Sequence, residues 1–214
     1  MTRLVLIRHG ESRGTVDQIV AGPVGCTGLS DLGVRQCEAL RDRLSRTGEL
    51  SDAGVLLASV LPRAVETAQI IAPGLGFEPS EVIEDCELCE LHPGAADGLT
   101  WTEFGARYGD PGMAAHPYAE LSPGGESLAG FHLRAGRALA RVVAEYEGQT
   151  VVIATHGGVV AVSMTLFLGL PGFGTQVELP TANTSLTEWV YRGPTWEGWS
   201  LARYNDAAHL LGGI

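Results

Sequence analysis

Three short runs of almost wholly apolar residues lie in the first three quarters of the chain. They cover Thr2–Ile7, Gly54–Ala58 and Thr150–Ala154. Runs of this length without polar alternation predict strands that are buried on both faces. Two later segments, Thr184–Tyr191 and Trp196–Tyr204, also have strand character and are separated by a turn signal at Gly193-Pro194.

The segments between these runs have the apolar spacing and the end signals of helices. One helix should begin after Ser30, which is a good N-cap residue. Pro62 fits a first helical turn, and its helix should end near Ala72, ahead of Pro73. Two longer helices are expected at Glu126–Tyr146, which is amphipathic, and at Gly157–Leu168, which is apolar on all sides and should therefore be buried.

Two stretches look irregular. Residues Gly10–Gly28 form a glycine-rich segment that we expect to be a loop. Residues Glu78–Gly125 are rich in Gly and Pro, with one short helix expected near Leu99–Tyr108. Because strands and helices otherwise alternate, the sequence predicts an α/β fold around a mostly parallel sheet. The expected organisation is a single domain over residues 1–214, with residues 78–125 as an excursion over the sheet.

Charge and composition exclude several classes of partner. The formal net charge is -11, with 14 basic and 25 acidic residues, so the surface should repel nucleic acid and anionic membranes. The longest apolar run, Val159–Leu170, is too short to cross a bilayer. Met1 leads directly into a strand rather than a secretory leader, so the four cysteines are expected to be thiols. The expected location is cytoplasmic.

Candidate chemistry follows each of the three apolar strands. The first strand ends at Arg8-His9-Gly10, the second is followed by Ser59 and Arg63, and the third ends at His156-Gly157. Because active sites of open α/β sheets gather at the carboxyl ends of strands, these groups should meet at one edge. Each feature alone has an ordinary interpretation as a cap, a solvated helix residue or a buried histidine. Their agreement at three strand ends favours a shared site.

Two arginines and two histidines suit phosphoryl transfer. Guanidinium groups hold a phosphate through several N–H donors and keep their charge. A neutral imidazole is a competent nucleophile toward phosphorus. Gly10 would allow close backbone approach, and the helix N-termini after Ser59 and His156 would add favourable dipoles.

These residues resemble the motifs of the histidine phosphatase superfamily, which includes the cofactor-dependent phosphoglycerate mutases. The resemblance covers almost the whole chain. It lies in residues 6–12, in 27–33 with Gln36, in 59–68, in 88–90 followed by Gly94 and 98–100, in 125–127 and in 152–158. It implies a phosphoglycerate mutase-like three-layer sandwich with helices on both faces of the sheet, and it places the excursion of residues 78–125 over the active-site edge.

The resemblance also implies roles for individual residues. His9 would be the nucleophile, Arg8, Arg63 and His156 would contact the phosphate, and Glu90 would be the general acid. No metal or other cofactor is implied. Further substrate contacts are expected from Ser12, Thr15 and Gly157. From spacing alone, Asp85, Glu87 and Asp97 are equally possible proton donors, and the Leu-x-Glu pattern of the family favours Glu90.

Departures from the family pattern bear on the reaction. Thr15 stands where many members have Asn, and Gln18 where many have Arg. Residues Asp110–Gly124 contain no Lys or Arg, whereas the mutases that resemble this chain carry several basic residues there. The expected function is therefore hydrolysis of a small phosphate monoester through a phosphohistidine on His9. The alternatives are a phosphoglycerate-type mutase, a phospholigand-binding module and a protein phosphatase.

Aromatic and cysteine residues near the expected acid have simpler interpretations. Trp101, Phe104 and Tyr108 would either line the pocket or fill the core of a helix. Cys86 and Cys89 have C-x-x-C spacing, but the second ligand pair expected of a metal site is missing from the sequence pattern. We therefore expect no metal or redox role for the two cysteines.

Overall fold

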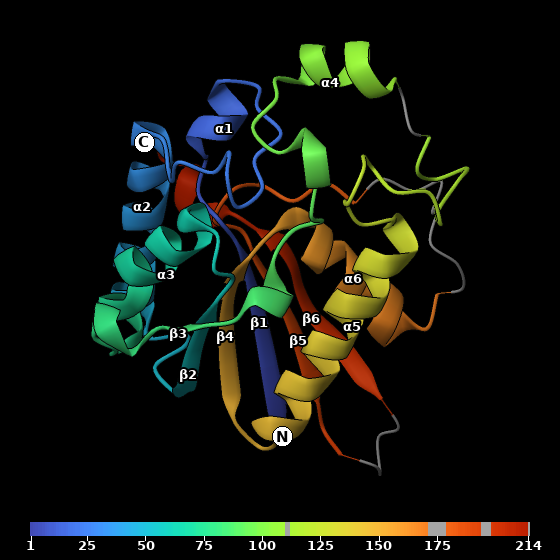
Figure 1. Cartoon of the computed structure of the whole chain (residues 1–214). Helices are drawn as coiled ribbons and strands as arrows, with labels where there is room; N and C mark the ends of the chain where they lie inside the picture. Colours follow the sequence, from blue (N-terminus) through green and yellow to red (C-terminus); the bar gives the residue numbers. More distant parts are fainter. Residues whose placement is uncertain (110–111, 171–178, 194–197, 214) are drawn as a thin grey trace.

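A six-stranded sheet runs through the middle of the protein (Figure 1). The computed structural model describes residues 1–109, 112–170, 179–193 and 198–213. The strands lie in the order β3-β2-β4-β1-β5-β6. Their bounds are β1 Thr2–Arg8, β2 Ala53–Ala58, β3 Ile83–Glu84, β4 Thr150–Thr155, β5 Leu186–Tyr191 and β6 Trp199–Asp206. The pairs β1–β4, β2–β4 and β2–β3 are parallel, and β5 runs antiparallel to both β1 and β6.

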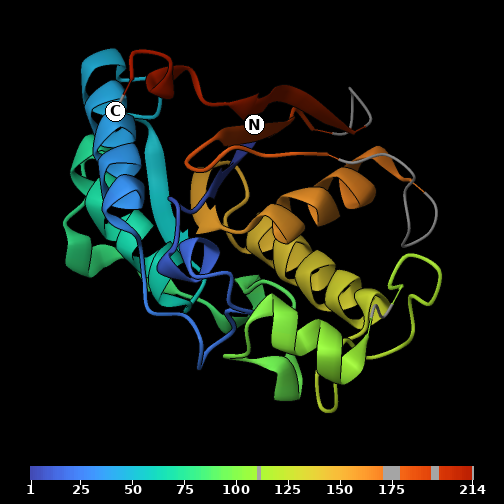
Figure 2. The same ribbon diagram turned by 90° about the horizontal axis from the view of Figure 1, so that it is seen from above.

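Helices cover both faces of this sheet. Helices α2 (Asp31–Thr47) and α3 (Pro62–Leu75) lie on one face, and α5 (Leu128–Glu145) and α6 (Gly157–Leu168) lie on the other (Figure 2). Strand β1 is buried from both sides, since Val5 and Ile7 pack in the α2–α3 cluster while Leu4 and Leu6 pack in the α5–α6 cluster. The predicted three-layer α/β fold, with a mixed but mostly parallel sheet, is confirmed.

The end of α3 differs from the prediction. The helix does not stop before Pro73 but continues to Leu75. Pro73 falls in the last turn, and Leu75 gains a buried place in the core, at 5% exposure. Gly76 then ends the helix in a left-handed conformation with φ 84°, and its N–H bonds to carbonyl oxygens of the last turn. The burial of Leu75 and the cap at Gly76 together offset the cost of the helical hydrogen bond that Pro73 cannot donate.

The ends of three other elements differ by a few residues from the bounds predicted from the sequence. Helix α5 begins at Leu128, after Ser127 acts as its N-cap, rather than at Glu126. Strand β5 begins at Leu186 rather than Thr184, because Thr184 has φ 56° and cannot continue a strand. Strand β6 begins at Trp199, and the predicted start at Trp196 and the proline of the predicted turn lie outside the described residues.

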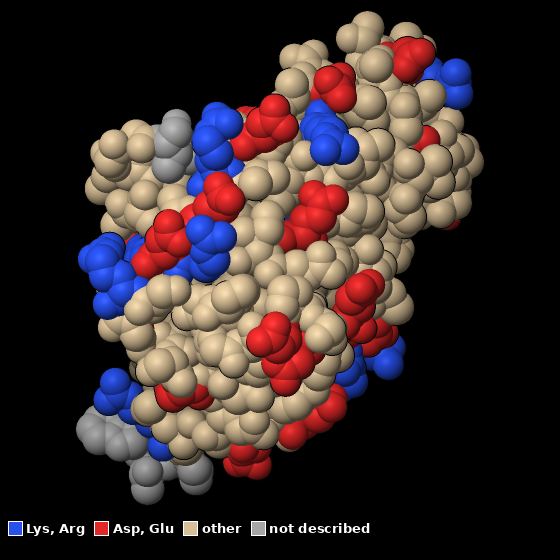
Figure 3. Space-filling view, turned by 90° about the vertical axis from the view of Figure 1, so that its left-hand side faces the viewer, with Lys and Arg blue, Asp and Glu red and all other residues tan. Residues whose placement is uncertain are grey.

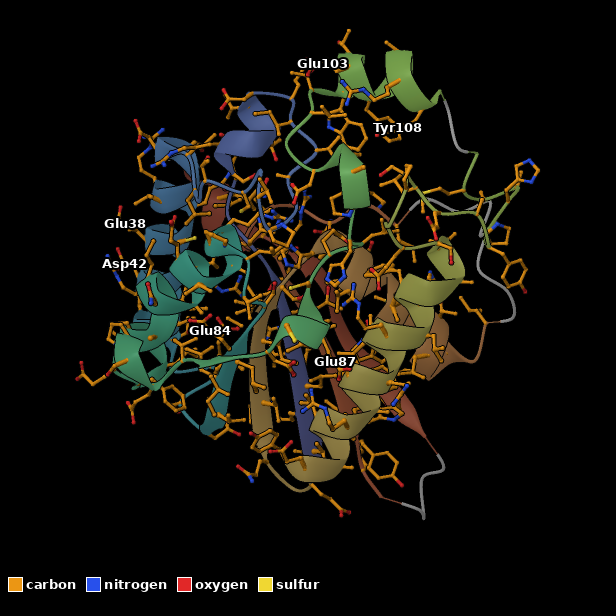
Figure 4. The ribbon with its side chains drawn as sticks, viewed as in Figure 1. Glu38, Asp42, Glu84, Glu87, Glu103 and Tyr108 are labelled. Atoms are coloured by element: carbon orange, nitrogen blue, oxygen red, sulfur yellow. The ribbon has the colours of Figure 1, made fainter. Side chains whose placement is uncertain are left out.

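Two short helices lie beyond the carboxyl ends of the parallel strands. Helix α4 (Trp101–Tyr108) was expected, and Thr100 caps it in a reciprocal arrangement with Glu103. Figure 4 shows Glu103 and Tyr108 on this helix, at the upper edge of the molecule. Helix α1 (Arg13–Val16) is a correction, since the segment after His9 was expected to be a loop throughout.

Close contact between two glycine backbones holds the loop after β1 against α2. A Cβ on Gly10 would lie 2.6 Å from the carbonyl oxygen of Gly33, and a Cβ on Gly33 would lie 2.0 Å from that of Glu11. Neither position tolerates a side chain without movement of the backbone. In addition, the Gly10 N–H donates to Thr67 Oγ1 of α3 at 3.1 Å. The loop that follows His9 is therefore fixed to both helices of this layer.

The surface carries charged side chains of both signs. On the face formed by α2 and α3, arginines lie beside acidic residues rather than in one continuous basic surface (Figure 3). Glu38 and Asp42 lie along the outer side of α2 (Figure 4). Within the described ranges, no helix combines the length and apolar character needed to cross a membrane.

Candidate active site

A cleft of about 630 Å³ opens at the carboxyl ends of the parallel strands. Six of the eight predicted catalytic and substrate-contact residues line it: Arg8, His9, Ser12, Thr15, Arg63 and Glu90. They come from the end of β1, from α1, from the first turn of α3 and from the segment after β3. The strand order explains this meeting, because β1, β4 and β2 are neighbours whose carboxyl ends share one edge.

His9 is held in one tautomer by its neighbours. Its Nδ1 lies 2.6 Å from the carbonyl oxygen of Gly10. A carbonyl oxygen only accepts, so Nδ1 carries the proton and donates it there. The other ring nitrogen, Nε2, accepts an N–H from Nε of Arg63 at 3.1 Å. The lone pair on Nε2 therefore points into the arginine-lined part of the cleft.

Burial and positive charge keep His9 neutral. The side chain is 6% exposed. Burial, followed by the positive charges of Arg63 and Arg8, lowers the pKa of His9 from 6.5 to about 3, against an opposing effect of the Gly10 hydrogen bond. Imidazole is nucleophilic only when deprotonated, so His9 is in the reactive form throughout the neutral range.

The two guanidinium groups at the cleft donate to backbone carbonyl groups. Among the described residues, Arg8 and Arg63 form no ion pair, whereas Arg3, Arg43 and Arg134 each lie within 3 Å of a carboxylate. Arg63 donates instead to the Ala21 carbonyl at 2.8 Å. Arg8 donates to the Thr181 carbonyl, and its Nε is buried without a partner in the described part of the chain. Burial lowers the pKa of Arg8, with Arg63 adding to the effect and Glu90 opposing it. Two guanidinium groups that form no ion pair with a described carboxylate suit the binding of an anion.

His156 lies behind His9, at the end of β4. It is fully buried and does not line the cleft, and its ring centroid lies 5.2 Å from that of His9. Its Nε2 bonds to Ser59 Oγ at 2.8 Å, while its buried Nδ1 has no partner among the described residues. Burial is the largest cause of a pKa well below 6.5. Gly157, the first residue of α6, also lies outside the cleft lining.

The four candidate proton donors occupy different environments. Glu90 alone among them lines the cleft. Asp85 and Glu87 instead pair with Arg141 on α5, and Figure 4 shows Glu87 beside that helix. Asp97 accepts three backbone N–H groups from the loop of residues 22–25, which gives it a structural role. Geometry thus favours Glu90 over its rivals.

Glu90 is oriented by two backbone donors. Its Oε2 accepts from the Gly158 N–H at 3.0 Å, and its Oε1 accepts from the Leu91 N–H at 3.1 Å. A Cβ at Gly158 would lie 2.1 Å from Oε1, so only glycine leaves room for the carboxylate. The first turn of α6 therefore positions Glu90, a role for Gly158 that the sequence pattern did not reveal.

Ser12 and Thr15 form a small hydroxyl pair at the cleft wall. Ser12 is the N-cap of α1 and accepts from the Thr15 N–H at 3.2 Å, while the two hydroxyl oxygens lie 3.0 Å apart. Ser12 is nearly fully buried, whereas Thr15 is exposed to the cleft. Both remain candidates for substrate contact.

Residues 181–184 clamp the end of β1, and nothing in the sequence pattern pointed to them. Asn183 Nδ2 donates to the carbonyl of His9 at 2.9 Å, and the Thr184 N–H donates to that of Arg8 at 2.8 Å. Thr184 adopts φ 56°, an unusual conformation for a β-branched residue. Strain of this kind persists where surrounding contacts impose it. Here the contacts fix the backbone of Arg8 and of His9, the residue that follows β1.

The aromatic and cysteine residues divide between cleft and core. Trp101 lines the cleft, and Phe104 packs instead in a small cluster with Val20. Cys86 is exposed and Cys89 is buried, and both are free thiols. Within the described part of the chain, no group of three or more His, Cys, Asp or Glu residues is arranged to hold a metal ion.

The state of His9 can be tested by titration. We expect the His9 imidazole to stay neutral, with its proton on Nδ1, from pH 8 down to pH 5, because burial and the two arginines lower its pKa to about 3. Long-range ¹H–¹⁵N correlation spectra of the imidazole nitrogens, recorded across this range, report both tautomer and charge. Replacement of Arg63 by Met should raise the His9 pKa. A His9 that titrates near 6.5, or that carries its proton on Nε2, would contradict this description.

Comparison with known proteins agrees with this geometry. The chain matches the model of the histidine phosphatase superfamily (branch 1) over residues 4–207. It is 31% identical over 210 residues to phosphoglycerate mutase-like protein 4 of Arabidopsis thaliana, covering 97% of this chain and 86% of that protein. It is 29% identical over 213 residues to a metal-independent phosphoserine phosphatase of Arabidopsis thaliana, covering 98% and 84%.

A solved structure shows the same fold. The protein YhfR of Bacillus stearothermophilus superposes with a TM-score of 0.82 at 29% identity, covering 98% of this chain and 99% of that one. The match of the family model to nearly the whole chain is decisive for classification. The chain belongs to branch 1 of the histidine phosphatase superfamily.

Proposed function

We propose that this protein is a phosphomonoesterase that hydrolyses a small phosphorylated metabolite through a phosphohistidine on His9, without a metal ion. One observation carries the proposal. A buried, neutral imidazole presents its Nε2 lone pair beside two guanidinium groups that have no acidic partner among the described residues. This combination supplies a nucleophile and the positive charge that a transferring phosphoryl group requires.

Substrate binding would rearrange the hydrogen bonds of Arg63. In the free protein its Nε–H donates to the His9 lone pair. A bound phosphate offers charged oxygen acceptors, which form stronger hydrogen bonds than a neutral ring nitrogen. The donor would therefore move to the phosphate, so that the nucleophile becomes free when the substrate arrives. Two nitrogen atoms that have no partner among the described residues, Nε of Arg8 and Nδ1 of His156, would complete the proposed phosphate contacts together with the N-terminus of α6.

The first chemical step forms a bond between His9 Nε2 and phosphorus. The bond from phosphorus to the ester oxygen breaks, and that oxygen takes a proton from the carboxyl group of Glu90. The imidazole ring becomes positively charged in this step. The Gly10 carbonyl, which accepts a hydrogen bond from Nδ1–H, stabilises that charge.

The second step returns His9 to its starting state. Glu90, now a carboxylate, takes a proton from water while the water oxygen attacks phosphorus. The bond from Nε2 to phosphorus breaks, and inorganic phosphate leaves. The two hydrogen bonds from Gly158 and Leu91 hold the carboxylate on the cleft side throughout.

We also propose that residues 1–214 act as one domain. The expected cytoplasmic location stays a prediction.

A mutase is the main alternative. It would return the phosphoryl group to a substrate hydroxyl and would need extra cations for a doubly charged substrate. Residues 110–124 contain no Lys or Arg, which favours hydrolysis. A pure binding module has no need for a neutral nucleophile beside a carboxyl group. A protein phosphatase would need a site open to a whole peptide, and the resemblance to phosphoserine-phosphatase and mutase-like relatives favours small substrates.

The role of Glu90 can be tested by changing the leaving group. Glu90→Gln should change kcat/KM little for p-nitrophenyl phosphate, because p-nitrophenolate leaves without a proton, provided that formation of the phosphoenzyme limits the rate. The same variant should lose about 10²-fold or more with an alkyl phosphate. Glu87→Gln is the matched control, since that carboxylate lies at the surface beside Arg141 and outside the cleft lining. Equal losses of Glu90→Gln on both substrates would show that Glu90 positions the site rather than donating a proton.

The reaction class can be tested with product analysis. The protein, treated thoroughly with a chelator, should release inorganic phosphate from a panel of phosphorylated metabolites. Incubation with 3-phosphoglycerate and a bisphosphate primer should yield no 2-phosphoglycerate, as followed by ³¹P NMR. Formation of 2-phosphoglycerate at a rate above phosphate release would favour the mutase. Loss of turnover on chelation, with recovery on adding a divalent ion, would contradict the metal-independent route.

A further inference from the structure

We propose that the alcohol part of the substrate is uncharged and partly apolar, and that monoesters carrying a carboxylate are poor substrates. The inference rests on the proposed phosphatase function and concerns the part of the cleft beyond the phosphate. It commits the protein to a substrate class different from phosphoserine or phosphoglycerate. The distribution of charge along the cleft wall carries it.

Positive charge in the cleft is confined to the phosphate site. All 14 basic residues of the chain are arginines, and the segments outside the described residues contain none of them. The cleft lining includes two of the 14, Arg8 and Arg63. Both belong to the group around His9, and the phosphate would occupy their donors. A second anionic group on the substrate would therefore find no cation of its own.

Other arginines are engaged elsewhere. Arg134 forms two hydrogen bonds to the carboxylate of Glu126, and Arg141 pairs with Asp85. Arg13, which follows Ser12 in the chain, donates to the Thr27 carbonyl at 2.8 Å. None of these side chains lines the cleft. The cleft lining therefore offers no arginine beyond Arg8 and Arg63, in agreement with the small number of basic residues in the sequence.

The wall that faces the phosphate site is mostly apolar. Its side chains come from α1 and the loop after it, from the segment after Glu90, and from α4 and the chain beyond it: Ile19, Val20, Leu91, Pro93, Trp101, Met113 and Leu121. Trp101 is 53% exposed although it is large and apolar, and its ring meets Phe104 edge-on at 5.6 Å. A ligand that covers this surface gains the free energy of burying it.

Gln18 gives the wall a neutral polar group. It lies in the cleft lining with φ 55°, and its carbonyl oxygen accepts the N–H of Trp101 at 2.9 Å. A side-chain amide donates to and accepts from hydroxyl groups but does not neutralise a carboxylate. The wall therefore suits an alcohol with a planar or aliphatic part and a few hydroxyl groups.

Desolvation adds to the discrimination. A substrate carboxylate bound in this cleft would lose water and gain no cation. An uncharged substituent of the same size has no such cost.

The test compares two esters that differ by one carboxylate. Values of kcat/KM are measured for phenyl phosphate and for 4-carboxyphenyl phosphate, whose phenolate is no poorer a leaving group. The wild-type protein should prefer phenyl phosphate by about 10-fold or more, the scale of one unfavourable contact in a substrate pocket. Met113→Arg, which adds a cation to the apolar wall, should reduce this preference several-fold.

A matched control separates local from overall charge. Leu133→Arg adds the same charge on α5, at a side chain that is 64% exposed and outside this cleft, and should leave the preference unchanged. Equal or faster turnover of the carboxylated ester by the wild-type protein would overturn the inference while leaving the phosphatase function standing. Absence of phosphate release from either ester, and from the wider panel of metabolites, would overturn the proposed function and the inference with it.

Discussion

The arrangement of the site depends on two arginines, Arg8 and Arg63, that lie at one sheet edge and form no ion pair within the described part of the chain. Arg8 and Arg63 create a positive field in a partly buried cleft, and that field, together with burial, keeps His9 deprotonated. The same field would attract a phosphate to the place where the His9 lone pair points. A buried charge without an ion-pair partner is costly, which supports the proposal that a ligand provides the partner that the described residues do not.

The fold provides that arrangement through strand order and backbone contacts. Strands β1, β4 and β2 are neighbours, which brings their three carboxyl ends together. The loop after β1 is tied to α2 by the contact of Gly10 with Gly33, and residues 183–184 hold the carbonyl groups at the end of β1 from the other side. The nucleophile candidate is thus placed by the backbone of three separate segments, which limits the motion of its ring.

Much of this was predictable from the sequence, and the remainder depended on long-range contacts. Apolar runs and helix caps located the main elements, since Ser30 and Pro62 act through local backbone chemistry. The continuation of α3 through Pro73 required knowing that Leu75 is buried. Spacing alone left four carboxylates as proton donors, and only the tertiary contacts of Asp85, Glu87 and Asp97 separated them from Glu90. The roles of Gly158 and Asn183 lie in contacts between segments 68 and 174 residues apart, which no local pattern records.

The central claim is that His9 becomes covalently phosphorylated, and trapping that intermediate tests it most directly. The protein is mixed briefly with a reactive monoester, quenched in alkali, digested and analysed by tandem mass spectrometry with ³¹P NMR of the intact phosphoprotein. The account predicts acid-labile phosphate on the peptide that contains His9, and none after His9→Ala. Phosphate on His156, or steady release of phosphate with no phosphorylated histidine at any quench time, would contradict it.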